Sequence, residues 1–123
     1  AYAFASLLSQ KTMLVFGSDA PVESPNPFWG IHAAVTRCRQ NGEPDSEGWN
    51  PKERISLNDA LKSYSQTPAA VFGKSHVLGQ IKIGFLADLL ILEKDPGSIN
   101  PQNLFQISPL DVMVGGNWVY HKI

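Results

Sequence analysis

The chain of 123 residues has one cysteine and no long apolar run. Cys38 has no second cysteine to pair with, which excludes an internal disulfide and is typical of a reducing compartment. We therefore expect a cytoplasmic protein. The longest apolar stretch, residues 85–92, is interrupted by Asp88 and is far shorter than the roughly 20 residues that a membrane-spanning helix needs, so we expect no membrane partner.

An excess of charge of one sign is also missing. The formal net charge is −1 and the signs are interspersed, so the basic stripe that is typical of nucleic-acid binding is absent. A small-molecule substrate or another protein surface is the expected partner. The first ten residues lack the basic end and cleavage pattern of a signal peptide. They begin within a helical pattern without an initiator methionine, and we expect the chain to be part of a longer protein.

Helical signals dominate the first two thirds of the chain. Periodic apolar residues predict a helix over 2–9, and Asn26-Pro27 predicts the N-cap and first residue of a helix that ends near Gly42. Ser56 is a good N-cap for the next helix, which should stop near Gln66. Thr67-Pro68 then restarts a short helix that Gly73 can close.

Strand signals are of two kinds. Residues 13–16 are apolar at successive positions, which is typical of a strand covered on both faces in a parallel sheet. After Lys74 the pattern becomes strand-like over 79–83 and 86–92, and Gly115-Gly116 predicts a hairpin within residues 112–120. We expect Trp49, Trp118 and Tyr120 to pack in the core.

The predicted strand over 13–16 ends on Gly17-Ser18-Asp19. In parallel α/β architectures, a side chain at the carboxyl end of a strand points into the crevice where ligands bind. A carboxylate there can bind a metal or accept a proton, so Asp19 is the candidate functional residue. The alternative is a turn in which the Asp19 carboxylate bonds to a nearby backbone N–H.

Three motifs in order resemble the carboxyl-terminal part of the amidohydrolase superfamily. They are Phe-Gly-Ser-Asp-Ala-Pro-Val at 16–22, Ala-Ala-Val-Thr-Arg at 33–37, and Gly-Gln-Ile-Lys-Ile-Gly-Phe-Leu-Ala-Asp-Leu-Leu-Ile-Leu at 79–92. The branch is similar to the amidohydrolase-3 group, which includes N-substituted formamide deformylases. The resemblance implies an α/β fold: residues 1–77 would be the last strand and flanking helices of a (β/α)8 TIM-type barrel, and 78–123 the strands of a small β-sandwich with a C-terminal hairpin.

The resemblance also implies a metal-dependent hydrolase. Asp19 would be a metal ligand or the general base, and Ser18, Pro21 and Glu23 would line the substrate pocket. Glu23 is equally well interpreted as a solvated surface charge. The expected cofactor is a divalent metal, with zinc as the first choice, bound mainly by residues that precede this chain. His32, His76 and His121 match none of the family's ligand positions, and we expect His32 to be a partly buried histidine with local hydrogen bonds.

The implied reaction is hydrolysis of a C–N bond, other than a peptide bond, in a small amide or formamide. A barrel needs about 250 residues, so this chain alone should be inactive. The alternative is a non-catalytic binding or regulatory module derived from the same fold. Because a segment of a closed barrel exposes apolar faces and strand edges, we expect self-association into a homo-oligomer in either case.

Overall fold

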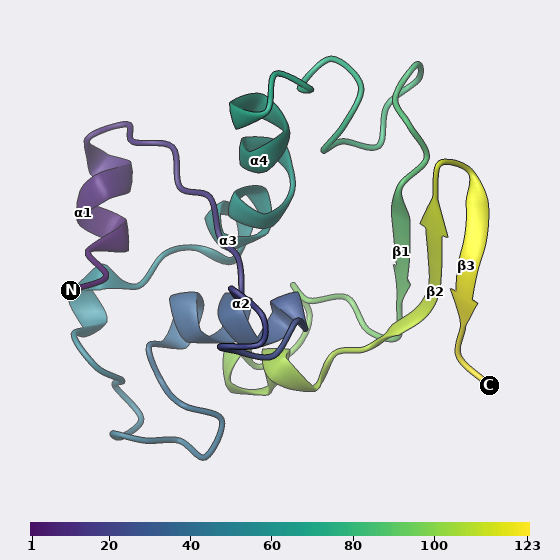
Figure 1. Cartoon of the computed structure of the whole chain (residues 1–123). Coiled ribbons are helices and arrows are strands. Elements are labelled where there is room, and N and C mark those ends of the chain that lie inside the picture. The colour runs from purple at the N-terminus through teal and green to yellow at the C-terminus, as the bar shows by residue number, and fades with distance from the viewer.

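The computed structural model describes all 123 residues, with helices in the first part of the chain and an antiparallel sheet in the second (Figure 1). The helical elements are α1 (Phe4–Ser9), α2 (Pro27–Thr36), the 3-10 helix η1 (Pro51–Glu53), α3 (Leu57–Tyr64) and α4 (Gln66–Val71). They are followed by β1 (Leu89–Leu92), the 3-10 helix η2 (Pro101–Gln106), β2 (Pro109–Val114) and β3 (Asn117–His121). The structure contains no helix of the length and apolarity needed to span a membrane.

The predicted helix starts at Asn26 and Ser56 are confirmed, whereas the predicted start at Thr67 is wrong, because α4 already begins at Gln66 and has no side-chain cap. The Asn26 side chain accepts a hydrogen bond from the backbone N–H of Phe28 at 3.0 Å, and Pro27 occupies the first helical position. The Ser56 hydroxyl likewise accepts from the N–H of Asp59 at 3.0 Å. Each cap satisfies an N–H group that the first turn of a helix leaves without a partner.

The predicted end of α2 near Gly42 is wrong. The helix stops at Thr36 because Arg37 adopts a left-handed backbone with φ +62°, which closes the last turn. The Arg37 side chain then donates from Nε to the Trp49 carbonyl and from a terminal nitrogen to the Tyr2 carbonyl, both at 3.1 Å. Tyr2 and Trp49 lie far from Arg37 in sequence, so the helical periodicity does not indicate these contacts.

The core lies where α2, α3 and η2 meet. Its buried apolar residues are Phe28, Ile31, Ala34, Ile55, Ala60, Leu104 and Ile107. Leu104 and Ile107 belong to the second part of the chain, which therefore returns to pack against the helices before forming β2. The division into barrel and sandwich segments at residue 77 stays a prediction.

The predicted strand over 13–16 is not formed. The segment contributes one backbone hydrogen bond, from the N–H of Phe16 to the carbonyl of Ser63 in α3 at 3.0 Å. A strand needs a neighbouring strand to complete its ladder, and no strand of this chain lies beside it. Met13 and Val15 are accordingly exposed.

The sheet has the order β1-β2-β3, with both pairs antiparallel. The predicted hairpin is confirmed: Gly115 and Gly116, at φ +55° and +82°, form the turn between β2 and β3. The Asp88 carboxylate accepts a 2.7 Å hydrogen bond from the N–H of Gly115, which fixes the turn against the start of β1. The strand-like stretch at 79–83 forms no strand.

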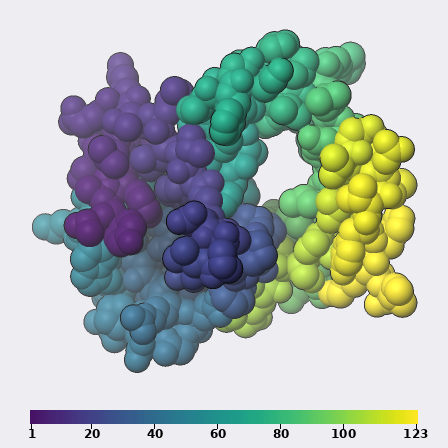
Figure 2. All heavy atoms as spheres, in the orientation of Figure 1, coloured from purple at the N-terminus to yellow at the C-terminus, as the bar shows by residue number.

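The three aromatic residues expected in the core are exposed instead. Trp49, Trp118 and Tyr120 retain 49%, 47% and 46% of their accessible surface. Trp118 and Tyr120 lie on β3, whose residues are all exposed, because no second layer covers the sheet. In Figure 2, a gap separates the helices from the sheet.

Gly48 offers a test of the contact at the end of α2. A β-carbon there would lie 2.3 Å from the Thr36 carbonyl oxygen, whereas one at Gly42 would meet nothing within 4 Å. Both glycines have positive φ, at +70° and +89°. We expect Gly42→Ala to lower the free energy of unfolding by about 1–2 kcal/mol through backbone strain. Gly48→Ala should lower the free energy of unfolding by about 1–3 kcal/mol more, because the new β-carbon overlaps the Thr36 carbonyl oxygen. Equal losses in urea titrations of the two variants would contradict this packing.

Candidate functional site

The residues around Asp19 form a closed turn. The Asp19 carbonyl accepts a hydrogen bond from the N–H of Val22 at 2.9 Å, and the Ser18 carbonyl accepts one from the N–H of Glu23 at 3.2 Å. The peptide bond between Ala20 and Pro21 is cis. Two nested backbone hydrogen bonds therefore hold the six residues from 18 to 23 as one compact unit.

The Asp19 carboxylate is exposed and has no partner. The backbone has φ +50°, a conformation that Asp and Asn adopt more readily than other non-glycine residues. No ion pair involves Asp19, and the side-chain hydrogen bonds nearest to it in sequence belong to Ser24 and Asn26. The turn is thus made by the Asp19 backbone, and the bond from a backbone N–H to its carboxylate, which the turn alternative required, is not formed.

The turn brings the predicted substrate-binding residues together. Ser18 is half-buried, while Pro21 and Glu23 are exposed beside Asp19 in sequence. Glu23 makes no ion pair within the chain. Their role in a substrate pocket stays a prediction, because one turn provides only one side of a pocket.

This chain alone does not fit a divalent metal ion. Nowhere in it do three His, Cys, Asp or Glu side chains lie together in a group that could hold one. Asp19 can offer a single carboxylate. His76 is exposed, and His121 on β3 bonds to Asp111 of β2, so neither lies with Asp19 in a ligand set.

His32 is more deeply buried than expected. It retains 1% of its surface, its Nε2 atom has no hydrogen-bond partner, and its ring packs edge-on against Phe105 of η2 at 5.1 Å between centroids. Burial lowers the pKa of His32, and the neighbouring Gln102 offsets part of that shift. The residue therefore supports the contact between α2 and η2 as a neutral imidazole.

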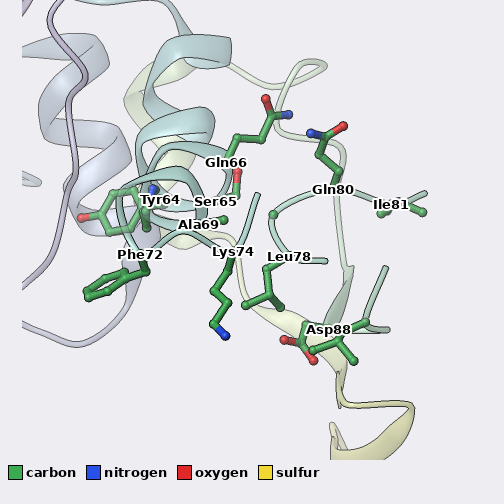
Figure 3. A pocket seen from close by; sticks show the side chains of 13 residues that line it. Tyr64, Ser65, Gln66, Ala69, Phe72, Lys74, Leu78, Gln80, Ile81 and Asp88 are labelled. Atoms are coloured by element: carbon green, nitrogen blue, oxygen red, sulfur yellow. The ribbon is translucent and has the colours of Figure 1, made fainter. Parts of the chain in front are cut away.

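A hollow lies elsewhere, between α4 and the loop that leads to β1 (Figure 3). It has a volume of about 810 Å³, and its lining includes Phe72, Lys74, Leu78 and Asp88. None of the predicted site residues lines it. Asp88, its one carboxylate, already accepts the hydrogen bond from Gly115. The hollow is thus separate from the predicted chemistry.

The fold is similar to part of a solved amidohydrolase structure. A crystal structure of an amidohydrolase from Thermotoga maritima superimposes with a TM-score of 0.70 over 98% of this chain and 26% of its own, at 20% identity. The sequence matches the Amidohydrolase family over residues 1–120. The chain therefore belongs to the Amidohydrolase family, which confirms the resemblance that the motifs indicate.

Curated relatives agree with this assignment. The chain is 32% identical to YtcJ of Bacillus subtilis over 99% of its length, and 35% identical to LONG AFTER FAR-RED 3 of Arabidopsis thaliana over 97%. It is 28% identical to the N-substituted formamide deformylase of Arthrobacter pascens over 95%. It spans only 23%, 20% and 21% of the length of these proteins, respectively.

The buried His32 makes stability depend on pH. Because its pKa in the folded chain lies below the ordinary value of 6.5, the unfolded chain binds the proton first as the pH falls. The contribution of His32 to the free energy of unfolding is complete above pH 6.5 and decreases as the pH falls below that value. We expect the free energy of unfolding to drop between pH 7.5 and 5, and His32→Gln to reduce that drop. His76→Gln, at an exposed position, is the control in denaturant titrations at both pH values. An equal pH dependence in all three proteins would contradict the assignment.

Proposed function

We propose that this chain is the carboxyl-terminal part of a metal-dependent hydrolase that cleaves a C–N bond, other than a peptide bond, in a small amide or formamide. Membership of the Amidohydrolase family supports the hydrolytic reaction. The observation that carries the proposal is the exposed Asp19 carboxylate, which has no partner and follows an extended apolar segment. Residues 1–77 are then the end of a (β/α)8 barrel, and residues 78–123 belong to a β-sandwich.

Asp19 has the properties of a general base in this proposal. Its carboxylate accepts a proton from the attacking water, whose oxygen forms the new bond to the carbonyl carbon. The same proton then passes to the leaving nitrogen as the C–N bond breaks. An exposed carboxylate on a turn with fixed backbone geometry suits both transfers, because no hydrogen bond of the chain competes for its oxygens.

The divalent metal, zinc in our proposal, needs ligands from outside residues 1–123. Asp19 contributes at most one carboxylate to it. The formamide class of substrate is favoured by the name of the relative from Arthrobacter pascens, an N-substituted formamide deformylase. Ser18, Pro21 and Glu23 form one side of the substrate pocket in this proposal.

Asp19→Asn in the full-length protein tests the proposal. Asparagine keeps the tolerance for positive φ but cannot accept the proton. We expect kcat/KM for amides and N-formyl compounds to fall by about 100-fold or more, with the circular dichroism spectrum unchanged. Metal content of both proteins, measured in parallel, reports whether Asp19 is also a ligand.

Asp95→Asn is the matched control, since Asp95 caps a surface turn by accepting a hydrogen bond from Gly97. It should retain nearly full activity. Unchanged hydrolysis by Asp19→Asn would remove Asp19 from the mechanism.

A self-associating, non-catalytic module is the second candidate. It is favoured by the open edge and exposed apolar side chains of β3, with Val119 retaining 61% of its surface. An exposed apolar edge strand can pair with the same strand of another copy. We expect the isolated chain to sediment as a dimer or larger species, and Val119→Lys to shift it toward the monomer. A stable wild-type monomer over the micromolar range would count against self-association.

A further inference from the structure

Val22 lies at the opposite end of the Asp19 turn. The hydrogen bond from its N–H to the Asp19 carbonyl makes the two residues the first and last of a β-turn, whose end Cα atoms lie within about 7 Å of each other. Val22 retains 73% of its surface. An exposed apolar side chain therefore stands close to the exposed carboxylate that the proposed reaction uses.

The exposure of Val22 differs in origin from that of Met13 and Val15. Those two belong to the extended segment, where a neighbouring strand would cover them. The turn from 18 to 23 is closed by its own backbone hydrogen bonds and follows that segment. Loops that follow strands at the carboxyl face of a barrel surround the reacting groups rather than pack in the core. In the proposed barrel, Val22 would therefore face a substrate rather than a strand.

The charged side chains near the turn in sequence are all acidic. Residues 12–36 contain no lysine or arginine, and their two acidic residues are Asp19 and Glu23. Neither carboxylate is paired within the chain. Within residues 12–36, a negatively charged substituent on the substrate would meet like charge and no lysine or arginine, whereas an apolar, uncharged substituent would meet Val22.

We propose that Val22 is a specificity-determining residue that contacts an apolar, uncharged substituent of the amide substrate. The inference rests on the proposed hydrolase activity and adds the substrate class: amides with an alkyl or aryl group in preference to amides with a carboxylate. Val22 takes no part in the bond-breaking step.

The experiment uses the full-length protein and two substrates of matched length, N-pentylformamide and N-formyl-4-aminobutyrate. The measured quantity is the ratio of their kcat/KM values. We expect the ratio for Val22→Lys to fall by about tenfold or more relative to wild type, because the ammonium group removes the apolar contact and attracts the carboxylate. Hydrolysis of unsubstituted formamide, which has no group to reach residue 22, is measured in parallel, because it reports any effect of the new charge on Asp19 itself.

Val71→Lys is the matched control, because it places the same charge at an exposed valine of α4, away from the turn and from the edge strand. It should leave the ratio unchanged. Val22→Thr covers the case in which Val22→Lys does not fold. Threonine keeps the shape but replaces a methyl group by a hydroxyl, and KM for N-pentylformamide should rise severalfold.

Two failures can be told apart. If the wild-type protein hydrolyses amides and neither Val22 variant alters the preference, the inference about Val22 is wrong and the proposed function stands. If the wild-type protein hydrolyses none of the three substrates, the formamide hydrolase activity is wrong, and the inference fails with it.

Discussion

The Arg37 guanidinium is the contact on which the helical part of the chain depends. It lies between the rings of Phe4 and Trp49, at 5.4 and 4.9 Å from their centroids, and donates to the carbonyls of Tyr2 and Trp49. A planar cation that stacks and donates at once cannot be replaced by lysine without losing the geometry. Through this one side chain, the start of the chain, the end of α2 and the surface loop share a single anchor.

The position of the Asp19 turn follows from that anchor. Arg37 fixes the end of α2, and the Asn26 cap fixes its start, so the segment leading into the helix has a defined direction. On the other side of the turn, the bond from Phe16 to Ser63 holds the extended segment against α3. Because α2 and α3 share one core, the turn is held at both ends by the same packed unit. Its two internal hydrogen bonds then fix the direction of the backbone at Asp19.

Features set by near neighbours could be predicted from the sequence, whereas features set by distant ones could not. Asn26, Ser56 and the Gly115-Gly116 turn act within three residues of themselves, and each appears where its local chemistry requires. The end of α2 depends on groups 12 and 35 residues away from Arg37, and no periodicity contains that information. The candidate site is local too: a carboxylate after an apolar run makes Asp19 a candidate, and Val22 lies three residues further on, but the sequence pattern does not specify the backbone hydrogen bonds that close the turn between them.

The turn also carries two carboxylates that form no ion pair within the chain. Most exposed carboxylates gain little from a partner, since water solvates them well. Asp19 differs because its backbone occupies a left-handed conformation that costs free energy. Nearby, Glu23 adds a second negative charge without a cation in residues 12–36. Strain and unpaired like charge held in one rigid turn are unfavourable for the isolated chain, which agrees with the proposal that a group outside it binds here. A cation beside Asp19 and a substrate against Val22 would each supply that benefit, and a turn that merely reversed the chain would need neither.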